Sequence, residues 1–200
     1  MTAPLSSFSV AVFLSGGGRS LQNLIDCKQR GELDEIDFRI VLSSSSKVRG
    51  VEVARKAGIE TMVVPQSTCT DANAYTEAMF GPCRQHGVNL VVMAGFLKHV
   101  LIPDDFAGRV INIHPSLLPS FGGEGMYGNR VHQAALDHGV KVSGCTVHFV
   151  DNEYDNGPIL LQRCCDVADD DTAASLAARV FELECKALPD AVRCCAQART

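Results

Sequence analysis

The chain has 200 residues, 46% of them hydrophobic and 20% charged, and carries a formal net charge of −5 at pH 7. This apolar content excludes a disordered chain, and the acidic balance argues against nucleic-acid binding, which requires a clustered excess of lysine and arginine. No apolar run approaches about 18 residues and no basic region precedes the apolar N-terminal stretch, so the sequence predicts neither a membrane span nor a signal peptide. We therefore expect a cytoplasmic protein with one α/β domain over residues 1–200.

Short apolar runs alternate with longer amphipathic stretches through the first half of the chain. Strands are predicted at 8–14, 38–42, 61–64 and 88–93, and helices at 20–30, 48–56 and 71–86. The strands are nearly continuous apolar runs, which is typical of strands covered by helices on both faces. The alternation predicts a doubly wound, Rossmann-like, parallel sheet.

The second half has a different pattern. A short strand at 110–114 precedes a helix at about 129–138, and two strand-like runs at 142–150 and 159–167 are joined by residues 151–158. This connection is too short for a crossover helix, so we expect an antiparallel pair, and then a long closing helix from about residue 172. The expected fold is thus a mostly parallel α/β sheet with a C-terminal antiparallel strand extension.

The cysteines number nine, without a C-x-x-C pair. The adjacent pairs Cys164-Cys165 and Cys194-Cys195 have diverging side chains, which suit neither a disulfide nor a tetrahedral zinc site. We expect small buried thiols in a reducing compartment and no metal site.

A glycine-rich segment, Ser-Gly-Gly-Gly-Arg-Ser at 15–20, follows the first predicted strand and opens the first helix. Backbone N–H groups and the positive end of a helix converge on an anion at this position of such a fold. The segment has neither a Walker loop's Gly-Lys-Ser/Thr ending nor the full dinucleotide fingerprint. It predicts a phosphate or phosphoribosyl cradle, and the alternative is a merely tight turn.

Polar side chains also mark the end of the strand at 110–114. Asn112 and His114 share one face of that strand, because positions two apart point the same way. An amide can donate to a developing oxyanion and a histidine can stabilise charge or move a proton, although a structural histidine is the alternative. Asp155, in the later turn, could supply a carboxylate to that histidine or simply bond its own backbone.

The remaining histidines carry weaker expectations. His148 either lines a pocket or makes a structural hydrogen bond, and residues 120–129, with four glycines, form either a mobile lid or a slack surface loop. Solvated helix or loop positions are expected for the other four, His86, His99, His132 and His138.

Taken together, segments 15–22, 112–119 and 148–158 resemble the glycinamide ribonucleotide formyltransferases, a folate-dependent family, over residues from about 8 to about 190. The resemblance implies transfer of the formyl group of 10-formyltetrahydrofolate to the amine of glycinamide ribonucleotide, in purine synthesis. It implies a phosphoribosyl-binding half at about 8–105 and a catalytic and folate-binding half at about 106–200.

The resemblance also implies roles for individual residues. The catalytic set would be Asn112, His114 and Asp155. The phosphoribosyl and glycinamide groups would be bound by Gly16, Gly17, Gly18, Arg19, Ser20 and Glu184. The folate would be bound by Leu97, Lys98, His99, Val100 and Asn112. Arg19-Ser20 stands where the family has Ser-Asn, and Lys98 where it often has Arg.

Two rival functions stay open, a formyltetrahydrofolate hydrolase and a catalytically silent binder of folate or nucleotide. The hydrolases usually carry an N-terminal regulatory domain, whereas this chain starts at the first strand; a formyltransferase acting on methionyl-tRNA would need a further basic domain. We expect small-molecule partners only, neither nucleic acid nor membrane, in a monomer or homodimer that uses no metal.

Overall fold

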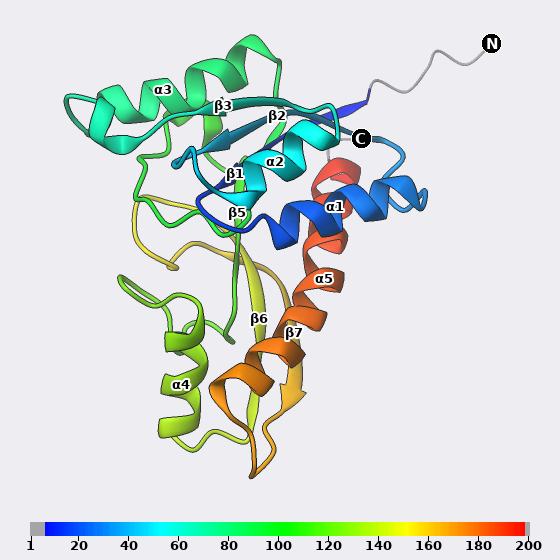
Figure 1. Ribbon diagram of the computed structural model, residues 1–200, viewed down its shortest axis with the longest axis vertical. Helices are drawn as coiled ribbons and strands as arrows, with labels where there is room; N and C mark the ends of the chain where they lie inside the picture. Colours follow the sequence, from blue (N-terminus) through cyan, green and yellow to red (C-terminus); the bar gives the residue numbers. More distant parts are fainter. Residues whose placement is uncertain (1–6, 199–200) are drawn as a thin grey trace. The chain divides into compact units, whose positions relative to one another are not determined.

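The computed structural model describes residues 7–198, which divide into two compact units. The first unit contains the residues up to Val110 and those from Val192 onward, and the second contains Ile111–Ala191. Figure 1 traces the order of the elements along the chain.

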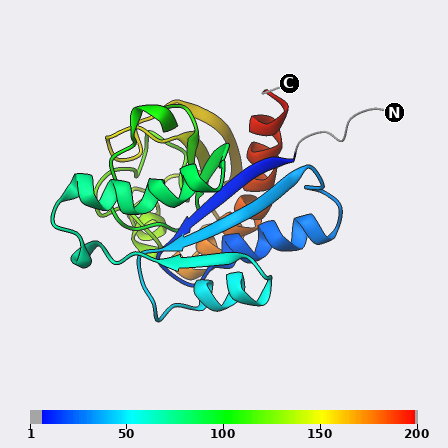
Figure 2. The ribbon, with the colours of Figure 1, turned by 90° about the horizontal axis from the view of Figure 1, so that it is seen from above.

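The first unit is built on parallel strands. They are β1 (Phe8–Leu14), β2 (Ile36–Ser43), β3 (Glu60–Val63) and β4 (Leu90–Met93), in the order β3-β2-β1-β4. The α-helices of this unit are α1 (Arg19–Gln29), α2 (Arg49–Lys56) and α3 (Ala72–Gln85), and the 3-10 turns are η1 (Gln66–Thr68) and η2 (Asp104–Phe106). Figure 2 shows α3 on one face of this sheet and α1 and α2 on the other, which confirms the doubly wound prediction.

Burial follows the position of each strand in that order. Every residue of β1 and of β4 is buried, as expected for central strands with helices on both faces. The same expectation is wrong for β3, where Glu60 is exposed and Met62 is 38% exposed. Because β3 ends the order, it has a neighbour on one side only, and its side chains are less covered.

The second unit contains antiparallel strands. These are β5 (Val110–His114), whose first residue belongs to the first unit, β6 (Val142–Phe149) and β7 (Ile159–Asp166). The helices are α4 (Asn129–Asp137) and α5 (Ala173–Gln197), and the last residues of α5 belong to the first unit. Within residues 7–198, the seven strands follow the order β3-β2-β1-β4-β5-β6-β7, a mostly parallel sheet with the expected antiparallel extension.

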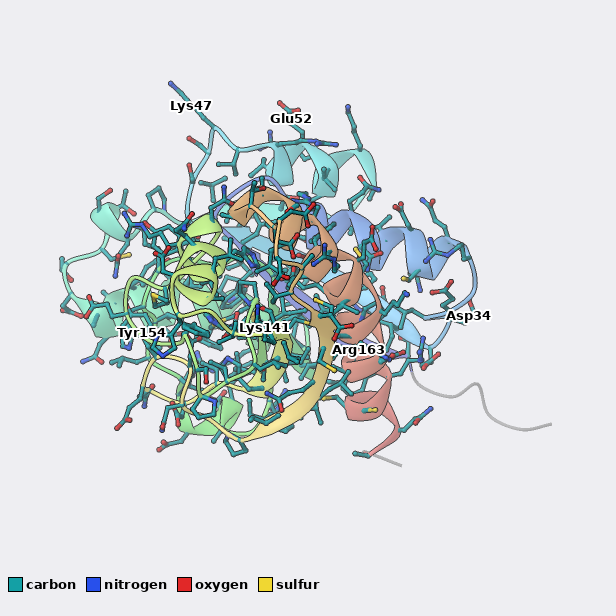
Figure 3. The ribbon with its side chains drawn as sticks, turned by 90° about the horizontal axis from the view of Figure 1, so that it is seen from below. Asp34, Lys47, Glu52, Lys141, Tyr154 and Arg163 are labelled. Carbon is teal, nitrogen blue, oxygen red and sulfur yellow. The ribbon has the colours of Figure 1, made fainter. Side chains whose placement is uncertain are left out.

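Local chemistry explains how the second unit reverses and closes. A Cβ at Gly157 would lie 2.0 Å from the Phe149 carbonyl oxygen, so the β6–β7 connection requires glycine there. The Thr172 hydroxyl accepts a hydrogen bond from the Ser175 N–H at 3.1 Å, which caps the start of α5. Arg163 of β7 pairs with Asp190 of α5, and Figure 3 shows Arg163 beside this helix.

The sequence predicted no membrane-spanning helix and buried cysteine thiols. None of the helices among the described residues, the 25-residue α5 included, is both long and apolar enough to cross a bilayer. All nine cysteines are free thiols, but the prediction that they are buried is wrong for six of them. Only Cys27, Cys83 and Cys145 are buried, and burial raises the pKa of the Cys83 thiol to about 12.

Candidate functional site

The glycine-rich segment connects β1 to α1, as predicted, although α1 begins at Arg19 rather than Ser20. Gly18 has φ 69°, in the left-handed region. A Cβ at Gly18 would lie 2.5 Å from the Gly50 Cα atom, at the start of α2. The third glycine is therefore required by the close approach of two backbone segments.

The other two glycines have a different environment. A Cβ at Gly16 or Gly17 would meet no other atom within 4 Å, so intramolecular packing does not require glycine there. The first N–H groups of a helix have no partner within it, so the start of α1 adds donors beside this open backbone. Figure 3 shows the exposed Lys47 side chain, before α2, extending away from the ribbon.

The predicted folate-binding residues 97–100 follow β4 and lie next to the glycine-rich loop. Ser15 joins the two: its N–H donates to the Gly95 carbonyl at 3.0 Å, and its hydroxyl accepts from the Leu97 N–H at 2.9 Å and from the Ser44 hydroxyl at 2.7 Å. The strand order reverses between β1 and β4, and ligands of such sheets bind at the carboxyl ends of the strands at that point.

The predicted folate-binding residues differ in exposure. The Leu97 side chain is 53% exposed and Lys98 is exposed, whereas Val100 is buried. The His99 carbonyl accepts from Gln66 Nε2 at 3.4 Å. Leu97 therefore has an exposed side chain, while its N–H is bound by Ser15.

Glu184 lies on α5 in the second unit, whereas the other predicted phosphoribosyl-binding residues lie in the first. Its carboxylate is close enough to Cys145 of β6 to act on it: burial, and then the Glu184 charge, raise the pKa of the Cys145 thiol to about 12. The Glu184 carboxylate is therefore near enough to β6 for its charge to act there.

The three predicted catalytic side chains all belong to the second unit and lie together there. Asn112 and His114 of β5 are paired with His148 and Thr146 of β6, and residues paired across antiparallel strands share a face. Asp155 reaches this face from the β6–β7 loop. Its Oδ2 atom is 3.4 Å from His114 Nδ1, and its Oδ1 atom is 3.6 Å from His148 Nε2.

The turn alternative for Asp155 is wrong. Asp155 has φ 52°, and its Oδ2 accepts from the Gly123 N–H at 2.9 Å, far along the chain. The local role belongs instead to Asp151, whose carboxylate accepts from the Glu153 N–H at 2.9 Å and from Asn156 Nδ2 at 3.1 Å. The left-handed conformation, which aspartate tolerates, aims the Asp155 carboxylate at the two histidines.

Hydrogen bonds to carbonyl groups set where the histidine protons lie. His148 Nδ1 is 2.9 Å from the Phe149 carbonyl, which only accepts, so Nδ1 carries hydrogen. In the neutral ring Nε2 is then an acceptor, and Asn112 Nδ2 donates to it at 3.2 Å. The amide of Asn112 keeps a second N–H for another acceptor. By the same argument His114 Nε2, 2.9 Å from the Phe121 carbonyl, carries hydrogen.

The environment of the cluster shifts two pKa values. Burial lowers the pKa of His114 below its ordinary value, and the Asp155 charge and the Phe121 carbonyl only partly offset it. Burial acts to raise the pKa of Asp155, but the neighbouring His148 and His114 side chains and the Gly123 N–H outweigh it, so that pKa is lowered. A neutral imidazole beside an ionised carboxylate is therefore the resting state near neutral pH.

The structure corrects or decides several expectations about the other histidines. His132 of α4 is only 4% exposed, so the expected solvated position is wrong, and its Nδ1 is buried without a hydrogen-bond partner among the described residues. Position 132 lies three residues before the buried Ala135, a helical spacing that could have revealed it. His148, left open between two roles, is 2% exposed and belongs to the cluster. Among the rest, His138 is exposed, and His86 and His99 are partly buried.

The loop at 120–129 contributes backbone groups that the sequence did not reveal. The Phe121 carbonyl and the Gly123 N–H hold His114 and Asp155, and a Cβ at Gly122 would lie 2.6 Å from Leu118 Cδ2. No group of three or more metal-binding side chains occurs among residues 7–198.

The sequence matches a family described as formyl transferase over residues 8–192. It is 39% identical over 179 residues to the chloroplastic phosphoribosylglycinamide formyltransferase of Vigna unguiculata, covering 88% of this chain and 56% of that protein. It is 38% identical over 187 residues to the human trifunctional purine biosynthetic protein adenosine-3, covering 92% of this chain and 18% of that protein. The chain thus spans about half or less of these curated relatives.

Solved structures are similar over nearly their whole length. Glycinamide ribonucleotide transformylase 1 from Symbiobacterium toebii has a TM-score of 0.87 and 34% identity, covering 97% of this chain and 90% of that chain. Phosphoribosylglycinamide formyltransferase from Brucella melitensis has a TM-score of 0.83 and 35% identity, covering 93% and 94%. With its family match over residues 8–192, the chain belongs to the formyl transferase family, among the phosphoribosylglycinamide formyltransferases.

Proposed function

We propose that this chain transfers the formyl group of 10-formyltetrahydrofolate to the amine of glycinamide ribonucleotide, giving formylglycinamide ribonucleotide and tetrahydrofolate. The observation that carries this proposal is a cluster of an amide, two imidazoles and a carboxylate. Asn112 contacts His148 at 3.2 Å, and Asp155 lies 3.6 Å from His148 and 3.4 Å from His114. Family membership supports the choice of reaction.

The reaction makes defined demands on these side chains. The neutral amine attacks the formyl carbon and forms a tetrahedral species with a negative oxygen and a positive nitrogen. The second N–H of Asn112 donates to that oxygen. The His114 Nε2–H donates to the Phe121 carbonyl at rest, and it donates instead to the negative oxygen when this stronger acceptor forms. The Asp155 carboxylate, through water, accepts a proton from the positive nitrogen of the tetrahedral species. That proton then passes to the folate nitrogen, which leaves as its bond to the formyl carbon breaks.

The phosphoribosyl and folate groups would be bound mainly by the first unit. The open backbone at Gly16 and Gly17 and the start of α1 accept the phosphate, with Gly18, Arg19 and Ser20 shaping the loop. The folate would contact Leu97, Lys98, His99 and Val100 of the first unit and Asn112 of the second. Glu184, also of the second unit, would contact the amine-bearing end of the nucleotide.

The experiment is an assay with both substrates that separates formyl transfer from formate release. We expect formyl transfer by the wild type and about a hundredfold loss of turnover in Asn112→Ala, because one donor to an oxyanion is worth about 3 kcal/mol. His114→Ala and Asp155→Ala should lose at least as much while keeping the fold. Near-normal rates in all three variants would contradict the assignment.

The same assay decides between the proposal and its rivals. Formate release without formyl transfer would identify a formyltetrahydrofolate hydrolase, and no turnover with retained folate binding would identify a silent binder.

Location and assembly complete the proposal. We infer action in the cytoplasm, a compartment that suits nine free thiols, although the plant relatives are named as chloroplastic. The chain acts on small molecules only, as a monomer or homodimer, which sedimentation analysis of the purified protein distinguishes.

A further inference from the structure

A row of paired side chains crosses the strands of the second unit beside the cluster. His114 of β5 is paired with Thr146 of β6, and Thr146 is paired with Gln162 of β7. Because residues paired across antiparallel strands share a face, all three side chains point to the side on which Asp155 and Asn112 lie. Only His114 of this row has a role in the proposed reaction.

The Thr146 hydroxyl is saturated with hydrogen bonds. It is fully buried, donates to the Ser116 carbonyl at 2.7 Å, and accepts from the Leu118 N–H at 3.0 Å and from Gln162 Nε2 at 2.9 Å. A hydroxyl has one hydrogen to donate and two lone pairs, so every position is used. Two of the three partners are backbone groups of residues 115–120, called here the proline loop.

Gln162 adds a further bond to the same loop. Its Nε2 also donates to the Leu118 carbonyl at 3.1 Å, so the two side chains together hold three backbone groups of the proline loop. Gln162 itself is an exposed residue of β7. The buried Thr146 is therefore the centre of the contact, and Gln162 supports it from the surface.

The proline loop leads directly into the backbone that holds the catalytic side chains. The Ser116 hydroxyl donates to the Ser120 carbonyl at 2.5 Å, which closes the loop on itself. The next carbonyl, that of Phe121, accepts from His114 Nε2 at 2.9 Å, and the Gly123 N–H donates to Asp155 at 2.9 Å. A shift of the proline loop would move both acceptor and donor.

We propose that Thr146, supported by Gln162, is a positioning residue for formyl transfer: through the proline loop it fixes the Phe121 carbonyl on His114 and the Gly123 N–H on Asp155. Thr146 touches neither of these catalytic groups by hydrogen bond, so it acts through the loop. This inference rests on the proposed function.

The test compares Thr146→Val, which keeps the side-chain shape and removes the hydroxyl, with Thr146→Ser, which keeps the hydroxyl. We expect kcat for formyl transfer to fall about 10-fold or more in the valine variant, with KM for glycinamide ribonucleotide unchanged, because misplaced catalytic groups cost rate rather than phosphate binding. The serine variant should recover kcat to within about 2-fold of the wild type. Hydrogen exchange of the Leu118 N–H should accelerate in the valine variant alone.

Thr61→Val is the matched control, since the Thr61 hydroxyl of β3 donates to the Ile59 carbonyl at 2.9 Å in the first unit. If Thr146→Val fails to fold, Gln162→Met replaces it, with an expected loss in kcat of about 3-fold or more. The inference is overturned if Thr146→Val, or Gln162→Met in its place, has the same kcat as Thr61→Val. It is also overturned if Thr146→Ser is as slow as Thr146→Val. An inactive wild type would instead contradict the proposed function.

Discussion

The Asp155 carboxylate lies between two histidine rings, and this position determines its chemistry. His114 and His148 lie at 3.4 and 3.6 Å from its two oxygens, and His148 also accepts the amide of Asn112. The two histidines are not equivalent, because His114 keeps its hydrogen on Nε2 and His148 keeps its hydrogen on Nδ1. His148 therefore orients Asn112, while the proposed reaction assigns His114 to the substrate.

This difference predicts the behaviour of His148 variants. His148→Phe removes the acceptor of the Asn112 amide, so kcat for formyl transfer should fall roughly 10- to 100-fold at constant KM for the nucleotide. His148→Gln, whose carbonyl can accept from the same amide, should restore part of kcat. Steady-state kinetics of both variants provides the measurement, and equal losses would show that the Asn112 contact is irrelevant.

At this scale the sequence indicated residue types better than contacts. Asn112 and His114 were predictable because alternation along a strand places them on one face. The choice of Asp155 over Asp151 was not, because it depends on the left-handed φ of 52° and on Gly123, which is distant in the sequence. The family resemblance, rather than the turn chemistry, identified Asp155.

At the scale of elements, packing requires glycine at one position of the glycine-rich loop, Gly18, and does not require it at Gly16 and Gly17. Gly17→Ala should leave thermal stability within about 1 kcal/mol, because a Cβ there meets no other atom within 4 Å. It should raise KM for glycinamide ribonucleotide about 10-fold or more, because the methyl group occupies the space of the phosphate.

Gly81→Ala on α3 is the matched control, since its Cβ would meet only the Glu77 side chain, at 3.1 Å. Titration of the nucleotide in the kinetic assay, together with thermal melting, measures both effects. An unchanged KM in Gly17→Ala would remove the loop from phosphate binding. A Gly18→Ala variant is uninformative for binding, because its Cβ would collide with Gly50.

The bounds of the predicted helices and strands were correct to within two residues, because each is an apolar run or an amphipathic stretch bounded by turn residues. β1 and β5 have the predicted bounds, and α2 and β7 differ by one residue at one end. The exposure of β3 was not predictable, because strand order is decided by pairing between distant segments.

At the scale of the whole molecule, buried histidines predict a dependence of stability on pH. Burial lowers the pKa of His114 and of His132, so both stay neutral in the folded protein while the unfolded chain takes up protons below about pH 6.5. The free energy of unfolding should therefore decrease as the pH falls from about 7 toward 5, by at most about 1.4 kcal/mol per pH unit for each histidine.

His132→Leu tests this account at a residue outside the catalytic set. The substitution removes one titrating group together with a buried Nδ1 that has no hydrogen-bond partner among the described residues. Urea unfolding at about pH 7.5 and about pH 5.5 should show a smaller difference in the variant than in the wild type, and no loss of stability at the higher pH. An unchanged difference between the two pH values would mean that His132 titrates alike in the folded and unfolded chain.

We predict that His114 and Asp155 act as one catalytic unit, and a double-mutant cycle on formyl transfer can show whether they do. We would measure kcat for His114→Ala, Asp155→Ala and the double variant under saturating substrates. If the two groups act as a unit, the double variant is about as slow as the slower single variant. If instead the two single losses multiply in the double variant, the groups act independently and the account is contradicted.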